Sequence, residues 1–173
     1  MGIAQGMDIF IDLAEKLNNN KDLGFLFVGR GSEVLRLKAS IKELSLSNIL
    51  FFDEIDPQEI PGLLEQCHIG LLALDPRHTT HNIPGKFLTY ILASLPVLAR
   101  VNAGTDLAHL IEVEGVGKVY VGDSVAELKT LAEEIIYNQK HYGYMASRGQ
   151  DLAKKMFSSK TAVMQIINTI KFN

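Results

Sequence analysis

The chain has 173 residues, a formal net charge of −3, 47% hydrophobic residues and 21% charged residues, a composition that fits one soluble globular domain. The charge gives no basic field for nucleic acid, and Cys67 is the only cysteine, which excludes intramolecular disulfides and cysteine-based zinc sites. No apolar run approaches the ~20 residues that span a bilayer, and we expect a cytoplasmic location.

The predicted elements alternate between helices with one apolar stripe and short strands that are apolar throughout. A helix is expected around residues 10–17. It is followed by "GFLFVG" (24–29), a wholly apolar run between two glycines, which is typical of a strand buried on both faces. Further strands are expected at 48–52, 68–74, 96–99 and 117–122. Further helices are expected at 32–44, 57–66, 84–95, 106–113, 124–138, 145–156 and 159–170.

This alternation predicts an α/β fold of the Rossmann-like kind, a parallel sheet with helices on both faces. We expect residues 1–173 to form a single domain, in which residues 140–173 supply the C-terminal helices. A doubly wound domain normally starts with a strand, whereas this chain starts with a helix. We therefore expect the first strand of the sheet to lie upstream of Met1.

Polar residues and prolines predict how several helices begin. Ser32 and Ser158 are expected to cap the helices that follow them, and Asp56 and Glu59 are expected to form a capping box. Pro84 is expected at the first helical position of its helix. The apolar stripe of that helix is expected to consist of Leu88, Ile91, Leu92 and Leu95.

Two strand-to-helix connections carry residues suited to binding phosphate, and ligands of open α/β sheets bind outside the carboxyl ends of the strands. In "VGRGS" (28–32), two glycines permit close backbone approach and Arg30 adds a charge, although a plain tight turn explains the glycines equally well. In the second connection, Lys86 falls in the first turn of a helix, where free N–H groups favour an anion. A surface lysine is the alternative interpretation.

Two histidines, His78 and His81, lie in the polar loop before that helix. An HxxH pair without a nearby cysteine falls short of a usual zinc site, so solvated loop histidines are the favoured interpretation. No Ser-His-Asp or carboxylate-pair spacing stands out. We expect no metal and no other cofactor.

The joint order of "FLFVGRGSE", "NILFFDEID" and "IPGKFLTYILASLPVLA" resembles the nucleotide-sugar-binding C-terminal half of GT-B glycosyltransferases. The type is that of the retaining group-1 enzymes of bacterial capsule and lipopolysaccharide assembly. The likeness covers about residues 2–135 and implies a UDP-sugar or other NDP-sugar as the donor substrate. It also implies a missing N-terminal acceptor domain and a glycan or lipid-linked acceptor. An isolated C-terminal half would be inactive, and the full-length enzyme could be peripheral at the inner face of the membrane.

The resemblance assigns the donor phosphates to three loops of this chain. Gly2 would approach the phosphates from the opening loop, and Gly29, Arg30 and Gly31 would face the pyrophosphate after the second strand. Pro84, Gly85 and Lys86 match the family's Pro-Ser-Lys turn at the diphosphate. Arg30 and Lys86 would be the catalytic residues, because they stabilise the leaving diphosphate.

The resemblance also assigns the base and the ribose of the donor. Glu54 and Ile55 match the segment whose backbone usually holds the base. His81 and Thr89 stand where the family often carries two glutamates eight positions apart. A threonine cannot make a carboxylate's bidentate pair with the ribose hydroxyls, so this chain departs from the family there.

Two other functions remain open at this stage. A GT-B-like sugar-nucleotide epimerase would need acid–base carboxylates and histidines in the cleft, which cannot be placed from the sequence. A non-catalytic flavodoxin-like regulatory or interaction domain is the alternative outside enzymes. If a central strand is absent, the exposed edges of its neighbours favour a dimer.

Overall fold

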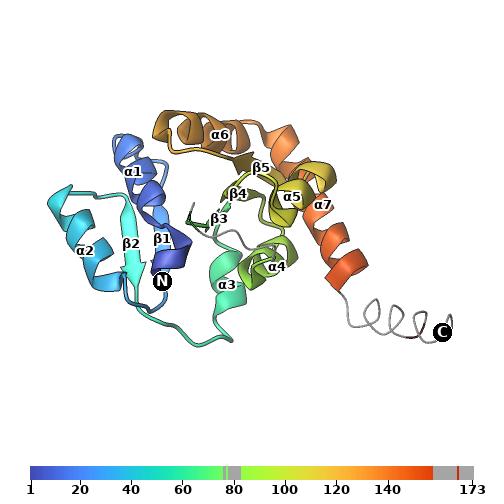
Figure 1. Cartoon of the computed structure of the whole chain (residues 1–173), viewed down its shortest axis with the longest axis horizontal. Coiled ribbons are helices and arrows are strands. Elements are labelled where there is room, and N and C mark those ends of the chain that lie inside the picture. The colour runs from blue at the N-terminus through green and yellow to red at the C-terminus, as the bar shows by residue number, and fades with distance from the viewer. Residues whose placement is uncertain (76, 78–82, 158–166, 168–173) are drawn as a thin grey trace.

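The computed structural model describes residues 1–75, 77, 83–157 and 167, in which short parallel strands alternate with helices (Figure 1). The strands are β1 (Phe25–Val28), β2 (Ile49–Phe52), β3 (Gly70–Ala73), β4 (Val97–Arg100) and β5 (Gly117–Tyr120). The helices are the 3₁₀ turn η1 (Ile3–Gln5), then α1 (Asp8–Lys16), α2 (Val34–Glu43), α3 (Ile60–Leu64), α4 (Gly85–Leu92), α5 (Asp106–Glu114), α6 (Val125–Tyr137) and α7 (Gln139–Phe157). Apart from Ile167, the helix predicted at 159–170 lies outside the described residues, as do its Ser158 cap, His78 and His81.

The strands form two parallel sheets rather than one. β1 pairs with β2, starting from Phe25 opposite Ile49. β4 lies between β3 and β5, with Val97 opposite both Gly70 and Gly117. The predicted α/β architecture with parallel strands is confirmed, and the division into two sheets falls between β1 and β3.

The backbone of β1 and β3 pairs on one side only. Phe25 donates to Asn48 on the β2 side, and Gly70 donates to Pro96 on the β4 side. Because successive peptide groups of a strand point to opposite sides, the N–H and C=O groups of Leu26 and Leu71 point away from those partners. The Tyr90 hydroxyl donates to the Leu71 carbonyl across 3.3 Å and so covers part of the β3 edge. The expectation of a missing strand fits these open edges and stays a prediction.

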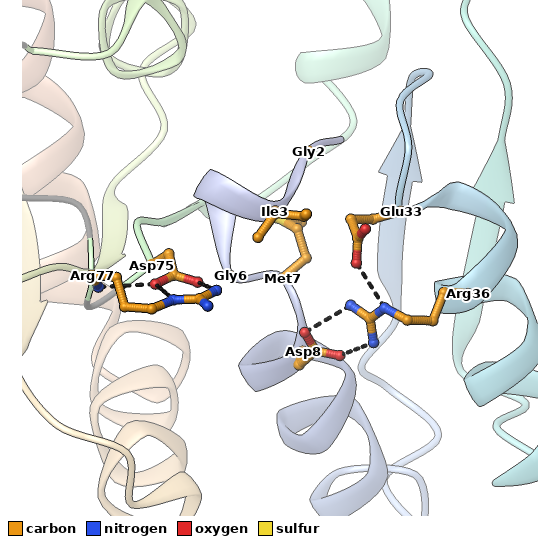
Figure 2. Close-up of a pocket in the computed structure, with 9 residues that line it drawn as sticks. All are labelled: Gly2, Ile3, Gly6, Met7, Asp8, Glu33, Arg36, Asp75 and Arg77. Carbon is orange, nitrogen blue, oxygen red and sulfur yellow. Dashed lines mark hydrogen bonds and ion pairs between the residues drawn. The ribbon is translucent and has the colours of Figure 1, made fainter.

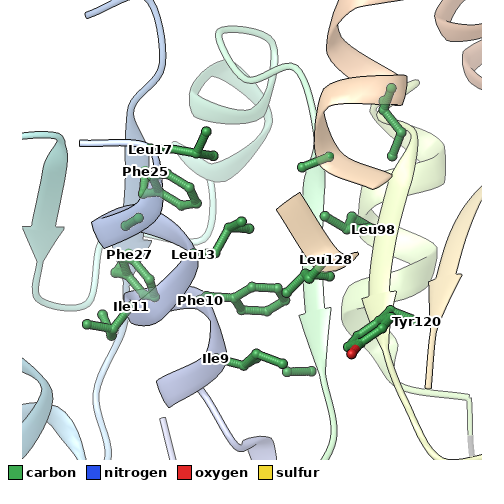
Figure 3. Packing of buried hydrophobic residues seen from close by; sticks show 14 of the residues in the cluster. Ile9, Phe10, Ile11, Leu13, Leu17, Phe25, Phe27, Leu98, Tyr120 and Leu128 are labelled. Atoms are coloured by element: carbon green, nitrogen blue, oxygen red, sulfur yellow. The ribbon is translucent and has the colours of Figure 1, made fainter. Parts of the chain in front are cut away.

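Apolar side chains of β3 and β4 alternate between two clusters, one on each face of their sheet. The β1–β2 sheet has such a cluster on one face only, because Leu50 and Phe52 on the other face of β2 are exposed, so the expected burial of the strands on both faces is wrong for β2. The first cluster joins α1 and α6 to strands of both sheets, with Phe10 completely buried (Figure 3). The second cluster joins α4, α5 and α7 to β3 and β4. Burying one large apolar side chain contributes about 1.5–3 kcal/mol. Since Leu98 faces the first cluster and Val97 the second, helices cover both faces of β4 as predicted.

Three predicted helix starts are wrong. Helix α2 begins at Val34 after Glu33, not after a Ser32 cap. The Asp56 carboxylate accepts from the Gln58 amide at 2.8 Å, which makes a turn, and α3 begins only at Ile60. Pro84 is the N-cap of α4 rather than its first helical residue, because its ψ of 139° is extended.

The buried face of α4 is also shifted from the predicted stripe. Phe87 and Ile91 are completely buried, whereas Leu92 is 59% exposed. Phe87 was not part of the predicted stripe. The helix packs mainly against α7 and β3. The buried side chains that enter the second cluster are therefore Phe87 and Ile91, which lie four positions apart on one face of the helix. Composition alone does not distinguish Leu92 from its buried neighbours.

This difference between adjacent residues is testable. We expect Ile91→Ala to lower the free energy of unfolding by about 2–5 kcal/mol, because it leaves a cavity in the second cluster. Leu92→Ala, the matched control on the next position of the helix, should change it by no more than ~0.5 kcal/mol. Urea unfolding followed by circular dichroism measures both. Equal losses in the two variants would contradict the helix orientation.

Candidate functional site

The loop after β1 is built by two glycines in conformations that other residues rarely adopt. Gly29 has φ of +131° and Gly31 has φ of +149°. The Gly29 amide donates to Phe52 at 3.2 Å, which ties the loop to the end of β2. A Cβ atom at Gly31 would overlap the backbone of Met1. Both glycines of "VGRGS" are therefore required by the backbone, as a phosphate turn or a tight connection would demand.

The first residues of the chain lie against this loop. The Met1 amino group donates to the Arg30 carbonyl, and the Glu33 amide donates to the Met1 carbonyl at 3.2 Å. Three residues later the Ala4 carbonyl accepts from the Asp75 amide at 2.9 Å, just past the end of β3. The segment that contains Gly2 thus contacts the carboxyl ends of both open strands.

Two of the predicted site residues form an ion pair. The Arg30 guanidinium lies 3.2 Å from the Glu54 carboxylate, and the two side chains are 83% and 57% exposed. An ion pair this exposed contributes about 0–1 kcal/mol, so either partner can exchange it for a ligand at little cost. Ile55, the next residue, is half-buried at the same edge.

Helix α4 presents its N-terminus with a lysine in the first turn. Gly85 and Lys86 are exposed, and the first bond from this turn runs from the Phe87 amide to the Pro84 carbonyl at 2.9 Å. Although the residue is exposed as a whole, desolvation of its ammonium group lowers the pKa of Lys86. Among the described residues no carboxylate forms an ion pair with it.

Electrostatics place Lys86 close to the N-terminal segment. The pKa of the Met1 amino group is lowered by burial and, second, by the charge of Lys86. Because Met1 also contacts Arg30 and Gly31, the structure brings Lys86 and the loop after β1 to one region. Arg30 has only its exposed ion pair with Glu54, and Lys86 has no ion pair among the described residues, so this region favours a negatively charged ligand.

Thr89 lies one turn further along α4, on the exposed side. Its hydroxyl donates to the Gly85 carbonyl at 3.1 Å. The hydroxyl hydrogen is therefore committed to the helix backbone in this structure, and the oxygen remains an acceptor. The position of its predicted partner, His81, lies outside the described residues.

Arg100 is a buried charge at the same edge that the sequence analysis did not identify. It is 5% exposed and donates to the carbonyls of Leu74 at 2.7 Å and Gly122 at 3.1 Å, and also to Asp123. These bonds tie together the loops that follow β3, β4 and β5. The signal that could have identified Arg100 in the sequence is an arginine at the end of an otherwise apolar strand.

A small cavity of about 130 Å³ lies beside Gly2 (Figure 2). Its other lining residues are Ile3, Gly6, Met7, Asp8, Glu33, Arg36, Asp75 and Arg77. In it, Arg77 pairs with Asp75 at 2.6 Å, and Arg36 pairs with Asp8 and Glu33. The cavity is smaller than the roughly 300–1,000 Å³ of typical ligand pockets, so it can form only part of a nucleotide site.

Two negative findings concern the described residues alone. They contain no group of three or more His, Cys, Asp and Glu side chains arranged to hold a metal ion. None of their helices is long and apolar enough to cross a membrane.

Comparison with known proteins gives one relative in sequence and several in structure. No protein-family model matches the chain. A probable glycosyltransferase of Pseudomonas aeruginosa, WbjE, is 24% identical over 135 residues, which cover 78% of this chain. The match covers 34% of WbjE, so the chain spans about a third of the length of its relative.

Solved structures match over nearly the whole chain. Anabaena HepE, in complex with UDP-glucose, has a TM-score of 0.76 at 21% identity and covers 98% of this chain and 46% of its own. The lipopolysaccharide glycosyltransferase WaaG has a TM-score of 0.72 at 20% identity, over 89% of this chain and 40% of its own.

A third structure consists of a C-terminal domain alone. It is that of LpcC, a group-1 glycosyltransferase of Francisella tularensis, with a TM-score of 0.72 at 20% identity, over 92% of this chain and 84% of its own. The resemblance stated from the sequence is thereby confirmed: the chain is related to a glycosyltransferase and has the Rossmann-like fold of the C-terminal half of group-1 GT-B enzymes.

Proposed function

We propose that this chain is the donor-binding part of a retaining, metal-independent glycosyltransferase that moves a sugar from an NDP-sugar to a glycan or lipid-linked acceptor. The observation that carries the proposal is that the Gly2 segment contacts Arg30 at the carboxyl edge of the sheets, where the charge of Lys86 also acts on the Met1 amino group. The relationship to WbjE and the UDP-glucose complex of HepE support it. Bacterial capsule or lipopolysaccharide assembly is the proposed context.

In this proposal the diphosphate binds where positive charge gathers. Lys86 and the free amides at the start of α4 receive one phosphate, while Arg30 leaves Glu54 and pairs with the other. As the bond to the sugar breaks, negative charge builds on the leaving diphosphate, and these groups stabilise it. Gly29 and Gly31 let the backbone approach the phosphates closely.

The remaining contacts belong to the nucleoside. The backbone of Glu54 and Ile55 holds the base, and UDP is the expected nucleotide. Thr89 offers an acceptor to a ribose hydroxyl, with His81 beside it, in place of the usual glutamates. No metal and no other cofactor take part.

The acceptor side of the reaction is assigned to a second domain outside this chain. Support comes from the WbjE match, which leaves about two thirds of that relative unmatched. Without that domain the chain cannot align donor and acceptor, so it is inactive alone. We place the full-length enzyme in the cytoplasm or peripherally at the inner face of the membrane.

The diphosphate should dominate binding. We expect UDP to bind roughly 10- to 100-fold more tightly than UMP, which is the factor that one charge-assisted hydrogen bond provides. With half of the cleft absent, the Kd for UDP is expected in the ~mM range. Calorimetric titration of both nucleotides measures this. Equal affinities, or no binding of any nucleoside diphosphate, would count against the proposal.

Lys86→Ala should separate binding from stability. We expect it to leave the melting temperature nearly unmoved and to weaken UDP binding by about 1.5–3 kcal/mol, because a charge-assisted hydrogen bond is lost. Since the pKa of Lys86 is lowered, UDP binding should also weaken as the pH rises through that pKa. Lys129→Ala, which removes a half-buried lysine of α6, is the matched control, and Thr89→Ala should cost less than Lys86→Ala. An unchanged Kd for Lys86→Ala would rule out its phosphate role.

The open edges of β1 and β3 should make the isolated chain associate. Unpaired apolar strands form backbone bonds with other chains, so we expect dimers or larger species at high concentration. Multi-angle light scattering across a concentration series tests this. A monodisperse monomer at the highest concentration would show that the edges are protected.

A further inference from the structure

We propose that Arg36 is a positioning residue for the donor site: it fastens the N-terminal segment, residues 1–7, to the loop after β1, residues 29–33. The inference rests on the proposed function, because both segments carry residues assigned to the donor phosphates. Arg36 itself is not assigned a contact with the ligand.

The contacts of Arg36 reach the bases of both segments (Figure 2). Its Nη1 and Nη2 atoms donate to the two oxygens of Asp8 at 2.5 and 2.9 Å, and its Nε atom donates to Glu33 at 2.7 Å. Asp8 is the first residue of α1, directly after Met7, and Glu33 is the N-cap of α2, two residues after Gly31. One guanidinium group therefore joins the points where the two segments enter their helices.

This arrangement is stronger than an isolated surface ion pair. The contact with Asp8 is bidentate. A planar guanidinium group can make such a two-bond contact with a carboxylate, whereas an ammonium group cannot. The Glu33 side chain is only 18% exposed, so its position is restricted. The hydrogen bonds from Arg36 lower the pKa of the Asp8 carboxyl, so the pair stays charged to a lower pH than an unpaired aspartate would.

The two segments are joined to each other by few bonds besides those of Arg36. Gly29 and Gly31 are intrinsically flexible, and a bound diphosphate must find both segments already in place to avoid the entropic cost of ordering them. The direct link between the segments consists of the Met1 bonds to Arg30 and Glu33. Arg36 joins the same two segments at their other ends, through Asp8 and Glu33.

The experiment uses the full chain with Arg36→Ala and Arg36→Lys. Its control is Arg148→Ala, because Arg148, on α7, likewise joins two elements by pairing with Glu114 of α5, away from the donor site. Two quantities are measured for each protein: the Kd for UDP by calorimetry, and the amide hydrogen exchange of Glu33 and Asp75. Those two amides donate to Met1 and Ala4 and so report on how the N-terminal segment is held.

For Arg36→Ala we expect UDP binding to weaken roughly tenfold, the smaller effect that is typical when a residue that orients a binding group is removed. We also expect faster exchange at both amides. Arg36→Lys should recover only part of either effect, because a lysine cannot make the bidentate pair. Arg148→Ala should lower the melting temperature at least as much and leave the Kd and both amides unchanged. In an Arg30→Ala background the Arg36→Ala effect on Kd should shrink, since the two act through one loop.

The inference is overturned if Arg36→Ala leaves both the Kd and the exchange of Glu33 and Asp75 at the parent values. It is also overturned if Arg148→Ala weakens UDP binding equally, since the effect would then be one of general stability. Failure of the proposed function looks different, because the parent chain itself would not bind UDP. In that case unchanged exchange in Arg36→Ala would still refute the fastening, and faster exchange would support it.

Discussion

The packing of α1 across the division between the two sheets is the contact on which the rest of the structure depends. β1 and β3 do not pair with each other, so the backbone does not join the two halves of the sheet. Phe10, Leu13 and their neighbours on α1 belong to one apolar cluster with β1 on one side and with β3, β4 and α6 on the other. Hydrophobic burial is non-directional, which lets a single helix hold two sheets that share no hydrogen bonds.

The candidate site follows from that contact because α1 begins where the site lies. The segment before α1 crosses from the end of β1 to the end of β3, and its bonds to Glu33 and Asp75 fix it there. Parallel strands end at one edge, so the loop with Arg30 and the start of α4 with Lys86 reach the same segment. Charge then distinguishes this region: carboxylates near it are paired with Arg36 and Arg77, whereas Lys86 has no ion pair among the described residues.

The sequence predicted the features that depend on local pattern. Five short apolar runs bounded by glycines and polar residues became the five described strands, because short apolar runs between turn residues are typical of strands in a parallel sheet. Gly29 and Gly31 were identified because only glycine adopts their backbone angles easily.

The features that could not be predicted depend on contacts between residues far apart in the sequence. The orientation of α4, with Phe87 inside and Leu92 outside, depends on where α7 packs. Asp8 is separated by 28 residues from Arg36, and its pairing required the fold.

The central claim is that a nucleoside diphosphate binds at the edge shared by the loop after β1 and the start of α4. Two-dimensional ¹H–¹⁵N NMR during a titration with UDP tests it most directly, because backbone amides are themselves the proposed phosphate ligands. The account predicts saturable shifts of the Gly31, Gly85 and Lys86 amides, with the amides of α6 and α7 unmoved. Saturable shifts confined to residues at the opposite, amino ends of the strands, such as Asn18 and Ser47, would contradict it.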